Sequence, residues 1–125
     1  IISAATLSEK PLIYGDLLKC GQHVDLVGAY QPHMRESDNA CIQKASVFLD
    51  TMEAGLKESG DIVIPISEGV LKQEDIKSDI KGLTSGVHPG RISNEEITLF
   101  KSVGHASEDL IAASYFYDRY RHEGN

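Results

Sequence analysis

Four short runs of apolar and β-branched residues recur along the chain, and each is followed by polar, glycine or proline residues. The runs lie at residues 1–6, 24–29, 46–50 and 97–100. The first three do not alternate cleanly between apolar and polar side chains, which is typical of strands buried on both faces. We therefore predict four strands of a sheet that is covered on both sides.

Helical patterns lie between the predicted strands. Ser37 is placed to cap a short helix that runs to about residue 45. A second helix is predicted over 51–59, where Gly60 would end it, and a third over about 73–83, whose apolar residues share one stripe. Because strands and helices alternate, we predict right-handed crossovers and a parallel sheet of the α/β class.

The longest helical pattern covers about residues 105–121. Its apolar side chains recur at spacings of four and three residues: Ala106, Leu110, Ala113, Tyr117 and Tyr120. A seam of this kind requires a surface to pack against. We therefore predict a long C-terminal helix that contacts another part of the protein or a partner.

Composition narrows the function classes. The 125 residues are 41% hydrophobic and 25% charged, as in an ordinary globular domain. A formal net charge of −7 argues against a nucleic-acid partner, and no apolar stretch approaches the roughly 18 residues of a membrane span. Cys20 and Cys41 lack metal-ligand spacing and are too few for a disulfide framework, so we expect a reducing, cytoplasmic environment.

Motifs that identify a catalytic centre are missing from the sequence. It holds no G-x-G-x-x-G, no phosphate-binding loop, no H-E-x-x-H and no G-x-S-x-G. The five histidines are scattered, with no pair four residues apart. We assign no catalytic residue and no metal site.

The ends of the predicted strands carry the remaining candidates, because ligands of parallel α/β sheets bind there. These residues are Thr6, Gly28–Ala29–Tyr30 and Ser102–Val103–Gly104. Small residues would let a flat ring approach the backbone, and free N–H groups at the start of a helix would suit an oxygen ligand. The alternative is that the glycines make tight turns and the hydroxyls cap helices.

Arg35 and Glu36 directly precede a predicted helix, and two interpretations stay open. In the first they form a local ion pair, which contributes at most about 1 kcal/mol if exposed. In the second they lock a loop beside a ligand pocket.

Several segments resemble the ornithine cyclodeaminase/μ-crystallin family, in order and over essentially the whole chain. They are Val24–Glu36, Val47–Asp50, Ala54–Asp61, Glu96–Gly104 and Glu108–Leu110. The resemblance implies an NAD(P)-dependent enzyme with a Rossmann domain and a separate substrate domain that dimerises. It also implies that residues 1–104 are the C-terminal half of the Rossmann-type sheet, and that 105–125 form a helix returning toward the substrate domain.

We interpret the chain as a fragment of a larger two-domain protein, because it starts at Ile1, without methionine, inside a predicted strand. The family's glycine-rich fingerprint and most of its substrate ligands would then lie upstream. The implied assembly is a homodimer when complete, or an association with the missing N-terminal segment.

Two positions favour one branch of the family. Where the cyclodeaminases have an acid/base aspartate and, four residues later, a lysine, this sequence has Tyr30 and Met34. An unperturbed phenol titrates at about pH 10 and does not replace a carboxylate. The segment is more similar to the Δ1-pyrroline-2-carboxylate/ketimine reductase branch, which implies hydride transfer from NADP or NAD to the C=N carbon of an imino acid.

The same resemblance implies a set of site residues. Those on the cofactor side are Ala5, Thr6, Leu7, Gly28, Ala29, Ser102 and Val103. Ser102 and Val103 would meet the carboxamide, while Tyr30 and Arg35 would border the substrate pocket.

We therefore expect a fragment of an NAD(P)H-dependent reductase of cyclic imino acids, inactive as an isolated piece, whose partner is a small imino-acid or amino-acid substrate. Two alternatives remain. One is ornithine cyclodeaminase, which converts ornithine to proline and ammonia. The other is a truncated, non-catalytic interaction module, which an unpaired edge of the first strand would favour.

Overall fold

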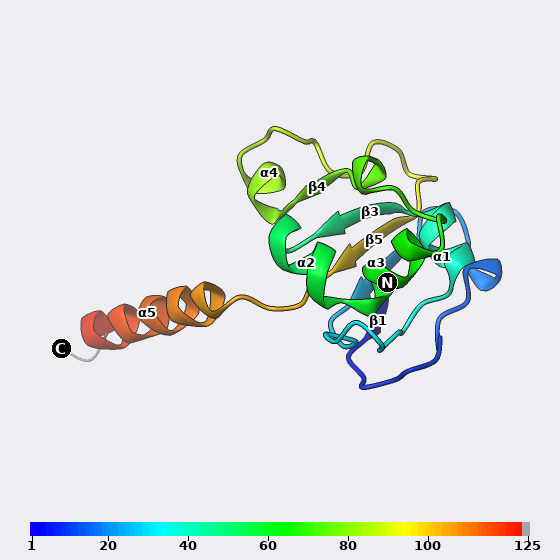
Figure 1. Ribbon diagram of the computed structural model, residues 1–125. Coiled ribbons are helices and arrows are strands. Elements are labelled where there is room, and N and C mark those ends of the chain that lie inside the picture. The colour runs from blue at the N-terminus through cyan, green and yellow to red at the C-terminus, as the bar shows by residue number, and fades with distance from the viewer. Residues whose placement is uncertain (124–125) are drawn as a thin grey trace.

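A five-stranded parallel sheet forms the centre of the computed structural model, which describes residues 1–123 (Figure 1). In spatial order the strands are β1 (Ile2–Ala4), β2 (His23–Leu26), β5 (Thr98–Lys101), β3 (Ser46–Leu49) and β4 (Ser78–Asp79). All four pairings between neighbours are parallel. The predicted α/β class with a parallel sheet is confirmed, and β4 is a strand that the sequence patterns did not indicate.

Three helices lie against one face of this sheet (Figure 1). They are α1 (Asn39–Lys44), α2 (Met52–Glu58) and α3 (Gly60–Ser67). The remaining helical elements are the 3-10 turns η1 (Gly15–Leu17) and η2 (Gln73–Asp75), the short α4 (Ile80–Thr84) and the long α5 (Ala106–Glu123).

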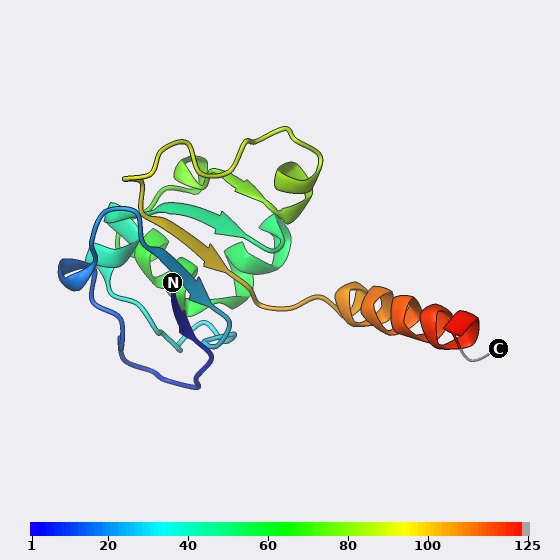
Figure 2. The same ribbon diagram turned by 180° about the vertical axis from the view of Figure 1, so that it is seen from behind.

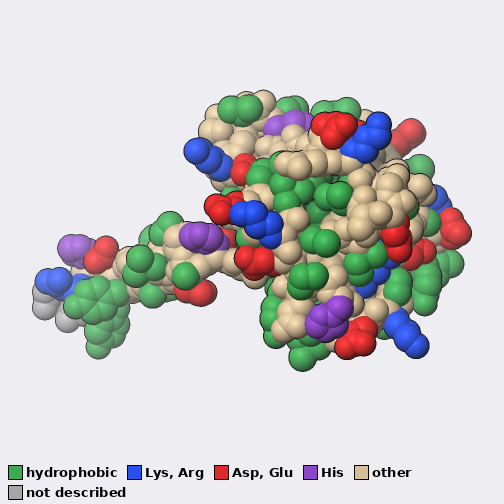
Figure 3. All heavy atoms as spheres, viewed as in Figure 1, with side chains coloured by type: hydrophobic (Ala, Val, Ile, Leu, Met, Phe, Trp, Pro, Cys, Tyr) green, Lys and Arg blue, Asp and Glu red, His purple; other side chains and the backbone are tan. Residues whose placement is uncertain are grey.

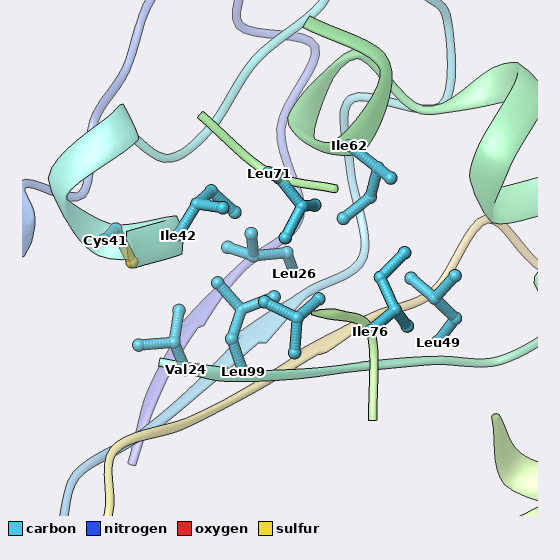
Figure 4. Packing of buried hydrophobic residues seen from close by; sticks show 10 residues of the cluster. Val24, Leu26, Cys41, Ile42, Leu49, Ile62, Leu71, Ile76 and Leu99 are labelled. Carbon is cyan, nitrogen blue, oxygen red and sulfur yellow. The ribbon is translucent and has the colours of Figure 1, made fainter. Parts of the chain in front are cut away.

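The hydrophobic core fills the space between the sheet and this helical layer (Figure 4). Its fully or almost fully buried members are Val24, Leu26, Cys41, Ile42, Val47, Leu49, Ile62, Leu71, Ile76 and Leu99. Alternate residues of a strand point to opposite faces, so β2 sends Val24 and Leu26 into the core and turns His23 and Asp25 to the other side.

The prediction that the sheet is covered on both sides is wrong for the described residues. The second face is covered only in part, where Leu83 and Arg91 line a cavity of about 280 Å³ together with Phe48 and Phe100. β1 stands at the edge of the sheet and is half-exposed, and the preceding Ile1 is 95% exposed. An edge strand is covered on fewer sides than a central one, which is why the apolar run is not buried here.

Two helix predictions are also corrected. The predicted helix over 51–59 is confirmed as α2, but Gly60, which was expected only to end it, begins a further helix, α3. The predicted helix over 73–83 is divided into η2, β4 and α4. The cap of α1 is Asp38, whose carboxylate accepts from the Cys41 N–H at 2.8 Å, while the hydroxyl of Ser37 donates to Asp61.

The last helix stands apart from the rest of the molecule (Figures 1 and 2). Every side chain from 106 to 122 is exposed, and apolar ones lie along the helix surface (Figure 3). Among the described residues, the predicted seam therefore packs on no other element. Residues 124 and 125 of the predicted 105–125 segment lie outside the described residues.

None of the helices described within residues 1–123 is long and apolar enough to cross a membrane.

Candidate functional site

The ends of β1, β2 and β5 lie side by side at the carboxyl edge of the sheet, as predicted. The N–H of Ala29 donates to the carbonyl of Thr6 at 3.0 Å, which joins the residues that follow β1 and β2. The N–H of Ser102 donates to the carbonyl of Leu26 at 2.9 Å, which joins the ends of β5 and β2. The structure thus brings Thr6, Ala29 and Ser102 together at one edge of the sheet, where Ala29 is fully buried and the other two are partly exposed.

The sequence suggested that Gly28 leaves room for a flat ring, but in the structure that room is filled by other parts of the chain. A Cβ at this position would overlap the backbone of Thr6 and the carboxylate of Glu36. Glu36 occupies this space because one of its oxygens accepts from the Thr6 N–H at 2.5 Å. The glycine therefore permits the close approach of two strand ends, and the space beside it is not open to an incoming ring.

Ala29 has an unusual backbone conformation. Its φ of +46° lies in the left-handed region, which L-residues other than Gly, Asn and Asp rarely adopt. Its side chain is fully buried, and its carbonyl accepts from the hydroxyl of Ser59 at 3.1 Å. The backbone of Ala29 is thus held at its N–H by the Thr6 carbonyl and at its carbonyl by the Ser59 hydroxyl.

The N–H groups after β5 are already occupied. Both Val103 and Gly104 donate their N–H groups to one oxygen of Asp50 at 2.8 Å, and the hydroxyl of Ser102 donates to the same oxygen at 3.2 Å. The expectation that these N–H groups are free for an oxygen ligand is therefore wrong. α5 begins later, at Ala106, after the left-handed Gly104 (φ +82°).

A buried lysine lies directly beneath these strand ends. The ammonium of Lys101 donates to the carbonyls of Leu26 (3.2 Å), Gly28 and Ser102 (2.7 Å), which accounts for all three of its hydrogens. Burial lowers the pKa of Lys101, whereas the charges of nearby carboxylates, Asp61 and Glu36 foremost, oppose that shift.

The segment 35–37 is fixed by contacts inside the chain. The Arg35 guanidinium donates to the Ser37 carbonyl at 2.5 Å and to the Asn39 side chain, and only 9% of the residue is exposed. Glu36 is fully buried and holds Thr6 rather than a helix N-terminus. The contacts of both residues are those of a local anchor, and a place for Arg35 beside substrate stays a prediction.

Above this hydrogen-bonded layer the edge presents apolar surface. Exposed fractions are 66% for Leu7, 47% for Val27 and 46% for Tyr30, and Ala5 is also exposed. A flat, partly apolar ring such as nicotinamide fits such a surface, with polar backbone fixed behind it. The residues present therefore suit one end of a dinucleotide.

Sequence reasoning missed Val27, Asp50 and Lys101. Asp50 and Lys101 did carry a signal, since each is a charged residue at the carboxyl end of an otherwise apolar strand. Such a residue is rarely buried without partners. Its partners lie far away in sequence, so the sequence pattern did not reveal them.

A parallel α/β sheet with its candidate site residues at the carboxyl edge is typical of nucleotide-binding folds of the Rossmann type. Comparison with known proteins makes this assignment specific. Residues 1–124 match the ornithine cyclodeaminase/mu-crystallin family. The chain belongs to that family, so the resemblance noted in its sequence is confirmed.

Two curated relatives show that this chain is similar to the reductases of the family. The Δ1-pyrroline-2-carboxylate reductase of Bacillus cereus is 41% identical over 120 residues, which cover 95% of this chain and 37% of the relative. The ketimine reductase mu-crystallin of Mus musculus is 37% identical over 118 residues, covering 94% of this chain and 35% of the relative.

A solved structure agrees with them. The Δ1-pyrroline-2-carboxylate reductase of Thermococcus litoralis, in complex with NADH and L-proline, matches with a TM-score of 0.91 and 38% identity. The match covers 98% of this chain and 38% of that one. The chain therefore spans a little over a third of the length of these relatives, and the likeness supports a nicotinamide cofactor.

Proposed function

We propose that this chain is the C-terminal part of the nucleotide-binding domain of an NAD(P)H-dependent reductase that acts on cyclic imino acids such as Δ1-pyrroline-2-carboxylate. In this proposal residues 1–104 belong to the nucleotide-binding domain, and 105–125 lead toward a substrate and dimerisation domain. The observation that carries it is the assembly of Thr6, Ala29 and Ser102 at one sheet edge beneath exposed apolar side chains.

Each strand end has a distinct part in this proposal. Ala5, Thr6 and Leu7 would line the ribose or nicotinamide side, and the buried Gly28–Ala29 peptide would lie behind them and hold the ends of β1 and β2 together. Ser102 and Val103 would meet the carboxamide through groups that Asp50 does not occupy. When bound, NADPH or NADH would supply the hydride, while these residues orient the ring and exclude water from one side of it.

Tyr30 favours reduction over ornithine cyclisation. It stands where the cyclodeaminases have an acid/base aspartate, and the residue is 46% exposed at the edge of the proposed pocket. A phenol in that position borders the substrate but does not accept a proton at neutral pH as a carboxylate does.

The decisive experiment uses the complete protein that contains this chain, with Δ1-pyrroline-2-carboxylate and either NADPH or NADH. We expect oxidation of one cofactor to match the formation of proline. Ammonia release from ornithine, together with no turnover of the imino acid, would instead support ornithine cyclodeaminase.

The isolated 125-residue chain provides a second test. We expect no measurable reductase activity, because the segments that bind the pyrophosphate in this fold and position the substrate lie outside the part matched here. Light scattering tests the interaction-module alternative. A chain that forms a stable self-associated species, while the complete protein binds neither NADPH nor NADH, would favour that alternative over the reductase.

A further inference from the structure

Lys101 has no assigned role in the proposed reaction, yet it links two strand ends of the candidate site. It is the last residue of β5, it is fully buried, and its register neighbours are Leu26 on β2 and Leu49 on β3. Its ammonium donates to the carbonyls of Leu26 and Gly28 on one side and of Ser102 on the other. One side chain thus ties the end of β2 to the end of β5.

The Gly28 carbonyl belongs to the peptide that leads into Ala29, the residue with φ of +46°. An L-residue keeps such a conformation only where its surroundings impose it. The Thr6 carbonyl holds the Ala29 N–H, the Ser59 hydroxyl holds the Ala29 carbonyl, and Lys101 holds the carbonyl that precedes Ala29. Among these partners, Lys101 carries a formal positive charge and makes the charge-assisted hydrogen bonds.

Three buried carboxylates surround this ammonium electrostatically, those of Asp61, Glu36 and Asp50. None accepts a hydrogen bond from Lys101 in the described structure, whose three donors go to backbone carbonyls. Asp50 instead fixes the backbone that follows Ser102. The charges of these carboxylates oppose the lowering of the Lys101 pKa by burial, and the lysine donates its hydrogens to carbonyls of the two strand ends.

We propose that Lys101 is a positioning residue of the reductase, which holds the Gly28–Ala29 peptide in its left-handed conformation and at a fixed separation from Ser102. The inference rests on the proposed function, because the two strand ends are the surfaces assigned to the nicotinamide ring and its carboxamide. Lys101 itself is buried beneath the backbone and touches neither cofactor nor substrate.

A double-mutant cycle on the complete protein tests the link between Lys101 and Ala29. Lys101→Met keeps an unbranched side chain, one heavy atom shorter, and removes its donors, and we expect a fall in Tm of about 10 °C. In an Ala29→Gly background, where left-handed backbone carries no strain, the same change should lower Tm by less than about half as much. Equal losses in the two backgrounds, or failure of Lys101→Met to fold in both, would overturn the proposal.

Cofactor affinity provides the functional readout. Lys101→Met should raise the Kd for NADPH or NADH by about tenfold or more, and Ala29→Gly in that background should recover part of the loss. The matched control is Lys44→Met, because Lys44 also donates to a backbone carbonyl, that of Gly15 at 2.9 Å, but away from the strand ends. We expect the control to leave Kd within about twofold. An unchanged Kd in folded Lys101→Met would overturn the positioning role.

Failure of the proposed function is distinguishable from failure of this inference. A wild-type protein that binds neither nicotinamide cofactor contradicts the proposed reductase. The Tm coupling between Lys101 and Ala29 does not depend on cofactor and still decides whether the lysine holds that peptide.

Discussion

One oxygen of the buried Asp61 carboxylate accepts two hydrogen bonds from Ser37, from its N–H at 2.8 Å and from its hydroxyl at 2.9 Å. The Glu36 N–H donates to the same oxygen at 3.0 Å. Asp61 lies in the first turn of α3, so this contact fastens α3 to the loop that carries Glu36 toward Thr6. The other Asp61 oxygen is buried and has no hydrogen-bond partner among residues 1–123.

This arrangement predicts a pH dependence of stability. Burial raises the pKa of Asp61 above its ordinary value of 3.8, so the folded state binds the proton more tightly than the unfolded state. The stability that this protonation contributes is complete below the ordinary value and is lost as pH rises through the raised one. The difference in free energy of unfolding between wild type and Asp61→Asn should therefore shift against wild type as pH rises from the ordinary pKa of 3.8 through the raised one. Urea unfolding measures it, and a difference that is flat or shifts the other way contradicts the assignment.

Substitution of Asp50 should lower the free energy of unfolding more than most substitutions at the carboxyl edge. Asp50→Ala leaves the N–H groups of Thr51, Val103 and Gly104 without their acceptor, and we expect a loss of about 2–4 kcal/mol in the free energy of unfolding. The matched control is Asp79→Ala, at the end of β4, whose carboxylate caps only the Gly82 N–H. The control should cost about 1 kcal/mol. Equal losses measured by urea unfolding would show that the Asp50 contacts do not cooperate.

Gly28→Ala should be severely destabilising, since its Cβ would overlap the Thr6 backbone and the Glu36 carboxylate. We expect a loss of more than about 3 kcal/mol, or no folded protein. Gly69→Ala separates this overlap from backbone strain, because Gly69 has φ of +72° but open space around it, and it should cost about 1 kcal/mol. Thermal unfolding of both variants decides; a mild effect of Gly28→Ala would mean that the two strand ends can separate.

Because α5 is exposed, we expect substitutions of its apolar side chains to leave the stability of the sheet unchanged. Leu110→Glu and Tyr117→Glu replace side chains that are 67% and 61% exposed, so the free energy of unfolding of the 125-residue chain should change by less than about 0.5 kcal/mol. Light scattering should show less self-association if the apolar surface of α5 mediates it. A large loss of stability would mean that α5 packs on the sheet in solution.

The strands and the carboxyl-edge cluster could be predicted because they depend on local pattern and on one rule of parallel sheets. The apolar runs mark β2, β3 and β5, and parallel strands place their ends at the same edge. The elements between residues 60 and 84 could not be predicted from local pattern in the same way. Gly60 resembles a helix stop, but it lacks a side chain because the carbonyls of Met34 and Pro32 approach it closely.

The roles of the buried charges were also beyond the sequence patterns. Lys101 finds its acceptors 73 and 75 residues away, and Asp50 its donors after β5 more than 50 residues away. Such pairs exist only once the strand order is known, and the order β2–β5–β3 is not the order of the chain. The same distances explain why the N–H groups of Val103 and Gly104 were expected to be free.

Small rotations of the backbone at Gly104 would move the far end of α5 by several ångströms. Its N–H is fixed to Asp50, its φ is +82°, and the 18-residue helix α5 begins two residues later. At 1.5 Å per residue that helix extends about 27 Å, so a rotation of about 10° at its base moves its far end by about 5 Å. The dihedral angles of Gly104, together with those of His105, therefore set the direction in which α5 leaves the sheet.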